Sequence, residues 1–445
     1  MNDATPPAPA AALAPDAAEA EAPPAPRTIE ATGLPREFLA EHALRVMFRR
    51  GIETGGDLCD AMRVAPTVVS DLVDQLRADR MIAPLGQLRA DLRSEMRYEL
   101  TDAGRRRAGE AASRLDYAGP APVTLDRWRA MVEAQAVRDR RIDRARLTAA
   151  FTHLITPAGV LDRLGPAVNS GRSILLYGPP GNGKSSYAHA LARAMEGGAW
   201  VPYALYVEGE VIQLFDPALH RLMPDEDPWT PAEMIHEGAP DLRFAHCVRP
   251  AVITGAELTT DMLALRFNPT SRVYQAPLHV KAGNGVFIVD DLGRQKEAPQ
   301  ALINRMIVPM EEGVDYLSLQ SGLSFQVPFD TLMIFSTNIN PADLLDVAGL
   351  RRIYYKILID RPSREDFVKI FLRVAKARGI EPVEDALAHI LAELYAKHDI
   401  GFAAYHAVYL IDQAIASCDY HGLPRSLHPD FIDDAWENLS VVDAA

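Results

Sequence analysis

Short apolar runs alternate with helix-like segments along the chain from Thr156 onward. The runs have the length of strands, and in the segments between them apolar residues recur at helical spacing. This alternation predicts an α/β fold in which helices cover both faces of a parallel sheet. A ligand of such a sheet binds at the carboxyl ends of its strands. The predicted strands are Ser173–Tyr177, Val252–Gly255, Val286–Val289 and the run from Leu332 to Phe335.

After residue 362 the strand pattern stops and only helices are expected, at about 364–378, 383–396, 402–418 and 429–438. Before that point, a long proline-rich insertion between about Trp200 and Arg249 interrupts the alternation, and its pattern predicts no role. The C-terminal part of the chain therefore divides into a core, residues 156–362, and a helical lid, residues 363–445.

The N-terminal part predicts a small helical domain over residues 31–118. Helices are expected at about Arg36–Phe48 and Gly56–Met62, and a third is expected to begin at Thr67 as its capping residue. A basic stretch, Gln87–Arg97, and a final strand from Tyr98 follow. Three short helices and a two-stranded wing resemble a winged helix-turn-helix domain.

The charges of this domain favour protein docking over DNA binding. Residues 35–115 hold 14 Arg and no Lys against 13 Asp plus Glu, and the third helix carries Asp71, Asp74 and Asp79. Acidic groups there would face phosphates and base edges that mostly offer acceptors. DNA binding stays open because Arg89, Arg93 and Arg97 of the wing are possible phosphate contacts, and a purely structural role stays open as well.

Two further segments are predicted to lie outside the folded domains. Residues 1–30 are nearly all Ala, Pro, Asp and Glu, and such a composition predicts a disordered tail. Residues 119–155 are expected to form a linker with a charged helix from about Leu125 to Leu147, which is interpreted as a solvated spacer.

The most specific motif follows the first core strand and matches the phosphate-loop pattern G-x-x-x-x-G-K-[ST] between a strand and a helix. Glycines let the backbone approach phosphate oxygens, and backbone N–H groups converge on the anion at a helix N-terminus. Lys184 adds a cation for the β and γ phosphates, and the Ser185 hydroxyl can ligate Mg²⁺. The predicted nucleotide-binding residues are Gly178, Pro179, Pro180, Gly181, Asn182, Gly183, Lys184, Ser185 and Ser186.

Polar residues at two later strand ends predict the rest of a hydrolytic site. Asp290 follows the strand Val286–Val289 and is expected to join Ser185 in the Mg²⁺ shell, while Asp291 can orient or deprotonate the attacking water. Asn338 can fix that water. The alternatives are a solvated aspartate pair and a turn asparagine.

An arginine pair, Arg351 and Arg352, provides the last catalytic candidates. An arginine supplied across a subunit boundary can stabilise the charge of a phosphoryl-transfer transition state. The alternative interpretation is an ordinary surface pair.

These four elements in this order resemble the AAA+ ATPases over roughly residues 156–440. Two features resemble the clade with a pre-sensor hairpin, which includes MoxR-like and magnesium-chelatase-like ATPases. The first is the segment Ala282–Asp291, which leads into and includes the strand that ends in the two aspartates. The second is the segment from Tyr316, in which apolar and polar residues alternate around Ser321-Gly322, a pattern that predicts a hairpin. The resemblance implies a ring oligomer, expected to be a hexamer, that uses ATP and Mg²⁺, and by position it makes Phe267 and Tyr274 pore-loop candidates.

The chain departs from the family pattern at two positions. The second carboxylate is Asp291 where the family usually has Glu, which is one methylene longer. The family usually has a sensor arginine at the start of the third lid helix. Here that helix is expected to begin near Gly401 and carries no arginine in its first turns, so the sensor arginine is either absent or replaced by Arg425.

Composition limits the remaining functional classes. A net charge of −14 and a pI near 5.4 argue against general electrostatic binding to nucleic acid or anionic membranes. The three cysteines lie far apart in the sequence and are expected to be buried thiols in a reducing cytoplasm, and the pattern predicts neither a signal peptide nor a membrane-spanning run. The leading hypothesis is a cytoplasmic ring ATPase that remodels a macromolecule, with protein favoured as its partner. The alternatives are a DNA-acting ATPase and an ATP-gated scaffold with little turnover.

Overall fold

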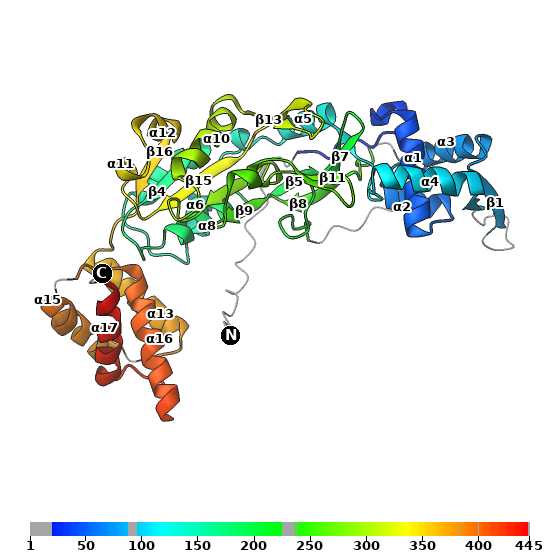
Figure 1. Ribbon diagram of the computed structural model, residues 1–445. Coiled ribbons are helices and arrows are strands. Elements are labelled where there is room, and N and C mark those ends of the chain that lie inside the picture. The colour runs from blue at the N-terminus through cyan, green and yellow to red at the C-terminus, as the bar shows by residue number, and fades with distance from the viewer. Residues whose placement is uncertain are drawn as a thin grey trace.

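The computed structural model describes residues 20–87, 96–224, 236, 238–381, 383–398 and 400–443. Figure 1 shows an elongated body with a small helical domain at one end and a separate helical bundle below the other end. Within the described ranges, no helix has both the length and the apolar character needed to cross a membrane.

A five-stranded parallel sheet forms the core of the C-terminal part, in the order β16-β4-β15-β12-β9. Its strands are β4 (Ile174–Tyr177), β9 (Ala251–Thr254), β12 (Val286–Val289), β15 (Leu332–Thr337) and β16 (Tyr355–Leu358). The four strands expected from the apolar runs are confirmed. The edge strand β16 was not predicted because Lys356 interrupts its short apolar run, and only Ile357 of its four residues is fully buried.

Helices cover both faces of this sheet, as side chains that alternate along β4 demonstrate. Ile174 and Leu176 pack in one layer with Leu191 of α8 (Lys184–Ala194), beside α7 (Val160–Asn169). Leu175 points to the opposite layer, where it packs with Leu302 of α10 (Pro299–Glu312). Successive residues of a strand point to opposite faces, so an all-apolar strand fits a sheet buried on both sides. The α/β fold class is confirmed.

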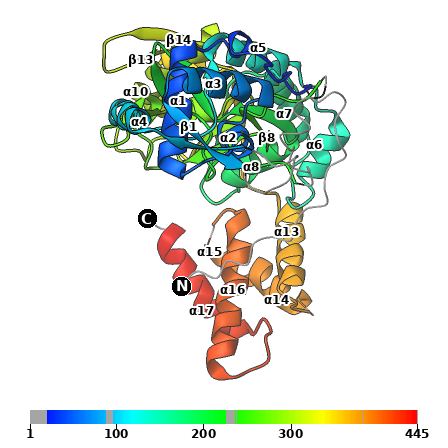
Figure 2. The same ribbon diagram turned by 90° about the vertical axis from the view of Figure 1, so that its right-hand side faces the viewer.

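The lid is a helical bundle with its own core, and Figures 1 and 2 both show it apart from the sheet. Its helices are α13 (Arg364–Ala377), α14 (Glu384–His389), a π-helical turn (Ile390–Leu394), α15 (Tyr395–His398), α16 (Ala404–His421) and α17 (Pro429–Asp443). Phe367, Leu410 and Trp436 lie in its buried centre. The expected helical C-terminal part is confirmed.

The N-terminal domain consists of α1 (Arg36–Arg50), α2 (Gly55–Met62), α3 (Pro66–Ala78), the antiparallel pair β1 (Ile82–Gln87) and β2 (Met96–Leu100), and α4 (Asp102–Arg114). Thr67 does not cap α3: the helix begins at Pro66, and the Thr67 hydroxyl instead donates to the Arg27 carbonyl at 2.6 Å. Of the wing arginines, Arg89 and Arg93 lie outside the described residues. Arg97 forms an ion pair with Glu53.

The predicted spacer is not a single solvated helix. It forms α5 (Leu125–Ala134), a short turn at Val137–Asp139 and α6 (Arg144–Ala150). Trp128, Met131 and Val132 of α5 are buried, so this helix packs into the body. The charge pattern misled the prediction because the three apolar residues of one face are outnumbered by charged residues on the other.

The proline-rich insertion contributes strands to a second layer. β6 (Ala204–Val207) and β7 (Glu210–Gln213) lie in the sheet β10-β11-β7-β6-β3, with β3 (Val123–Thr124), β10 (Arg266–Asn268) and β11 (Val273–Gln275). β5 (Gly198–Pro202) pairs with β8 (Phe244–Val248). The N-terminal domain contacts this second sheet, since the rings of Phe38 of α1 and Tyr206 of β6 lie 4.8 Å apart.

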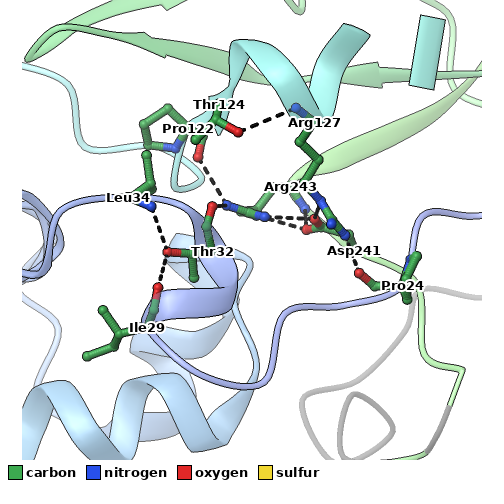
Figure 3. A network of polar contacts seen from close by, with 9 residues as sticks. All are labelled: Pro24, Ile29, Thr32, Leu34, Pro122, Thr124, Arg127, Asp241 and Arg243. Atoms are coloured by element: carbon green, nitrogen blue, oxygen red, sulfur yellow. Dashed lines mark hydrogen bonds and ion pairs between the residues drawn. The ribbon is translucent and has the colours of Figure 1, made fainter. Parts of the chain in front are cut away.

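A buried charged pair fastens the N-terminal segment to this second layer (Figure 3). Arg243 is fully buried, holds both oxygens of Asp241 at 2.9 Å and donates to the carbonyls of Thr32 and Pro122. The Asp241 N–H donates to the Pro23 carbonyl at 2.6 Å. The prediction of a disordered tail is wrong for residues 20–30, because these contacts and the burial of Ile29 order them. Residues 1–19 lie outside the described part.

Candidate functional site

The predicted phosphate loop connects β4 to α8 and needs glycine at three positions. Gly178, Gly181 and Gly183 have φ values of 141°, 73° and 80°, a region that side chains disfavour. A Cβ atom on Gly178 would lie 2.2 Å from the carbonyl oxygen of Ile359, just after β16. The loop is thus pressed against the end of the unpredicted strand, and any side chain at Gly178 would collide with it.

The Lys184 side chain lies folded into the loop. Its Nζ donates to the carbonyl oxygens of Gly178 at 3.0 Å and Pro179 at 2.8 Å, and the residue is only 6% exposed. Burial lowers the pKa of Lys184, while the charges of Asp291 and Asp290 act in the opposite direction. A cation is therefore held at the mouth of the loop, with two carboxylates beside it.

Three oxygen atoms from three elements meet at Asp290. The Ser185 hydroxyl at the start of α8 donates to Asp290 Oδ1 at 3.0 Å, and the Ser336 hydroxyl of β15 donates to the same oxygen. Among the described residues, no three His, Cys, Asp or Glu side chains gather as metal ligands. Mg²⁺ is often held by one or two protein oxygens together with phosphate and water oxygens, so Ser185 and Asp290 fit such an ion.

Asp291 and Asn338 face each other across adjacent strand ends, as the sequence predicts. The Asn338 Nδ2 group donates to Asp291 Oδ1 at 3.2 Å. Asp291 has a φ of 50°, and its N–H donates to the Ser336 hydroxyl at 3.2 Å. This left-handed residue is the second after the end of β12, and its carboxylate accepts from the amide that follows the neighbouring strand. A water molecule bound beside this pair would find an amide donor in Asn338 and a carboxylate acceptor in Asp291.

Gln295 supports this turn and was missed by the sequence analysis. Its side chain is buried, and its Nε2 group donates to the carbonyls of Gly255, Asp290 and Asp291 at 3.1 to 3.3 Å. Its Oε1 accepts the Gly293 N–H at 2.9 Å. A glutamine among charged loop residues carries no signal by itself. Only the fold reveals that its side chain holds the backbone carbonyls of both aspartates.

The arginine pair does not meet the loop within one chain. Arg351 and Arg352 end α12 (Val347–Arg352) and are exposed; Arg352 pairs with Glu311 at 3.0 Å. The Arg352 carbonyl accepts from the hydroxyl of Ser173, which immediately precedes β4, whereas the phosphate loop follows β4. The pair therefore lies at the opposite edge of the sheet from Lys184.

Arg425 also lies away from the loop. It forms two hydrogen bonds of 2.9 Å with Asp419, near the C-terminal end of α16. The loop instead contacts the beginning of that helix, where the Tyr405 N–H donates to the Gly181 carbonyl at 2.9 Å. The structure does not bring Arg425 to the place of a lid arginine.

The hairpin expected before the sensor strand is present, whereas the pore-loop candidates are not placed as expected. β13 (Val314–Ser318) and β14 (Ser324–Pro328) pair antiparallel directly before β15. Tyr274 is only 3% exposed, and its hydroxyl accepts the Gln320 N–H of this hairpin at 3.0 Å. Phe267 is half-buried against the Tyr274 ring. Tyr274 does not fit the pore-loop role for which it was a candidate, because its ring is buried and β11 belongs to the second sheet.

Comparisons with known proteins give a family match for the lid and distant structural likenesses. Residues 363–438, which span α13 to α17, match a family model described as a domain of unknown function, DUF8689. No curated protein matches the chain.

Solved structures that resemble the chain include a mutant of RuvB from Thermotoga maritima, with 14% identity, covering 69% of this chain and 74% of that one, TM-score 0.33. A model of the magnesium chelatase subunits BchI and BchD has 16% identity, covers 65% of this chain and 93% of that one, and has a TM-score of 0.34. NtrX from Brucella abortus in complex with ADP has 14% identity, covers 63% of this chain and 54% of that one, and has a TM-score of 0.31. These likenesses are too weak to carry an argument, and the functional assignment has to stand on the site.

Proposed function

We propose that this protein is an AAA+ ATPase that binds Mg-ATP at Gly178–Ser186 and hydrolyses it. One observation carries the proposal: at the carboxyl ends of one parallel sheet, Asp290 contacts Ser185 of the phosphate loop and Asp291 contacts Asn338, although these residues lie far apart in the sequence. Phosphate loops, acidic strand ends and a polar neighbour are the parts that phosphoryl transfer to water requires.

Each side chain has a distinct role in this proposal. The loop N–H groups and Lys184 hold the phosphates, and Lys184 leaves its two loop carbonyls to do so. Ser185 and Asp290 offer oxygen ligands to Mg²⁺, which supplies charge stabilisation on the phosphates. Asp291 accepts the proton of the attacking water, or orients it, and Asn338 fixes that water from the other side. Gln295 keeps the turn of the two aspartates rigid.

The proposed active form is a ring, expected to be a hexamer, in which a neighbour contributes Arg351 or Arg352. Both are exposed at the sheet edge opposite their own loop, so only another copy can receive them at its phosphates. The proposed partner is a protein, and the winged-helix-like domain is the docking module. Its third helix exposes Asp71 and Asp74, which disfavours a nucleic-acid surface.

A subunit-mixing experiment tests whether the site is shared between copies. Lys184→Ala subunits lack a working loop, and subunits with Arg351→Ala and Arg352→Ala lack the shared cations, so each form alone should release almost no phosphate. Mixing them should restore a measurable fraction of the wild-type rate, since some interfaces then combine an intact loop with intact arginines. The arginine effect should be about 10³-fold or more.

The matched control for mixing replaces the second partner by a triple variant that carries Lys184→Ala, Arg351→Ala and Arg352→Ala. This mixture has no intact loop and should stay inactive. Equal rates for the two mixtures would contradict a shared site.

A further inference from the structure

The lid helix α16 begins on the phosphate loop. The N–H of Tyr405 donates to the Gly181 carbonyl at 2.9 Å, and the N–H of Ala404 donates to the Asn182 side-chain oxygen at 3.2 Å. These two donors belong to the first turn of an 18-residue helix. Two consecutive residues of the loop therefore contact two consecutive residues of the lid.

The loop supplies the cap that α16 cannot supply itself. The first N–H groups of a helix need acceptors from outside, which a Ser, Thr, Asp or Asn at the capping position usually provides. Here Ala403 occupies that position, and its methyl group cannot accept a hydrogen bond. Gly181 and Asn182 act in its place, so moving the lid away from the loop removes two acceptors from the start of the helix.

The Tyr405 ring makes the contact specific. A Cβ atom on Gly181 would lie 2.0 Å from Cδ1 of Tyr405, so the ring is packed directly against the glycine α-carbon. Behind this contact, the Arg361 guanidinium donates to the Gly401 carbonyl at 2.8 Å. This hydrogen bond joins the segment after β16 to the segment before α16, and it helps to keep the Tyr405 ring close to the loop.

We propose that Tyr405 and the first turn of α16 position the phosphate loop for nucleotide, at the place where this lid lacks an arginine. The inference rests on the proposed nucleotide binding at Gly178–Ser186. Because the lid holds the Gly181 carbonyl, the orientation of this peptide group is fixed before phosphate arrives. Less conformational freedom of the loop is therefore lost when nucleotide binds. Tyr405 is a positioning residue, since it acts on the nucleotide through the loop.

Mg-ADP titration of the full-length protein tests this role with a double-mutant cycle. Tyr405→Ala should weaken Mg-ADP binding about tenfold, and Tyr405→Phe, which keeps the ring, should bind as wild type does. Gly181→Ala should also weaken binding, because the new methyl group collides with the ring. In the Tyr405→Ala background that collision disappears, so the added cost of Gly181→Ala should shrink by about tenfold. Only a direct contact between ring and loop predicts this coupling.

Tyr420→Ala is the matched control, since Tyr420 lies on the same helix and is 86% exposed. It should bind Mg-ADP as the wild type does. Wild-type affinity in Tyr405→Ala, or equal costs of Gly181→Ala in both backgrounds, would overturn the inference while leaving the proposed function in place. A wild-type protein that binds neither Mg-ADP nor Mg-ATP would instead overturn the proposed function.

Discussion

Substituting alanine for Lys184 is expected to abolish binding of Mg-ATP at micromolar concentrations. The ammonium group is buried in the loop, donates to two loop carbonyl oxygens, and lies near enough to Asp291 and Asp290 for their charges to favour its charged form. Triphosphate oxygens would be stronger acceptors for this group than the loop carbonyls. Loss of such charge-assisted bonds should weaken affinity by about 100-fold.

Lys376→Ala is a suitable control for this substitution, because Lys376 is exposed on α13 and the change removes the same charge. Both variants should be compared by calorimetric titration with Mg-ATP. If Lys184→Ala bound Mg-ATP as tightly as Lys376→Ala, the nucleotide would not occupy this loop.

Asp291→Asn is expected to separate binding from hydrolysis. The amide keeps the shape of the side chain and its contact with Asn338 but cannot accept a proton from water. Removal of a general base typically costs a factor of about 10² to 10⁴ in rate. Mg-ATP affinity should stay within about twofold of wild type, since the proposed metal ligands Ser185 and Asp290 are untouched.

The experiment combines single-turnover phosphate release with titration of the same Asp291→Asn sample. Asp343→Asn, an exposed carboxylate of α11 (Pro341–Leu344), is the control and should keep full turnover. Full turnover in Asp291→Asn would show that another group activates the water. Loss of affinity in parallel with rate would mean that Asp291 serves binding and not the proton transfer.

The sequence was most informative where one local pattern determines one local structure. Two apolar strands are followed by polar residues of the site, so the pairing of β12 with β15 brings Asp291 to Asn338. The loop motif likewise positions Lys184. A parallel sheet requires this meeting at one edge. The lid helices were predictable for the same reason, because helical spacing extends over whole segments.

Contacts between distant segments could not be predicted. β16 pairs with β4 although its residues show no strand pattern, and Tyr274 joins a sheet whose strands come from three separate stretches of chain. The tail prediction failed at Pro23 and Ile29 because their partners lie in the N-terminal domain and the insertion. Gln295 and Tyr405 belong to the same class: the Gln295 amide and the Tyr405 ring each contact the backbone of a distant segment, and such contacts carry no sequence signal.

Phosphate release from saturating Mg-ATP, measured per subunit over a range of protein concentrations, tests the central claim most directly. The proposed site contains its own loop, metal ligands and water-binding pair and takes its arginine from a neighbour. The rate per subunit should therefore exceed the Lys184→Ala background and rise with concentration as rings assemble. Bound Mg-ATP without phosphate release at any concentration would contradict the account and favour an ATP-gated scaffold.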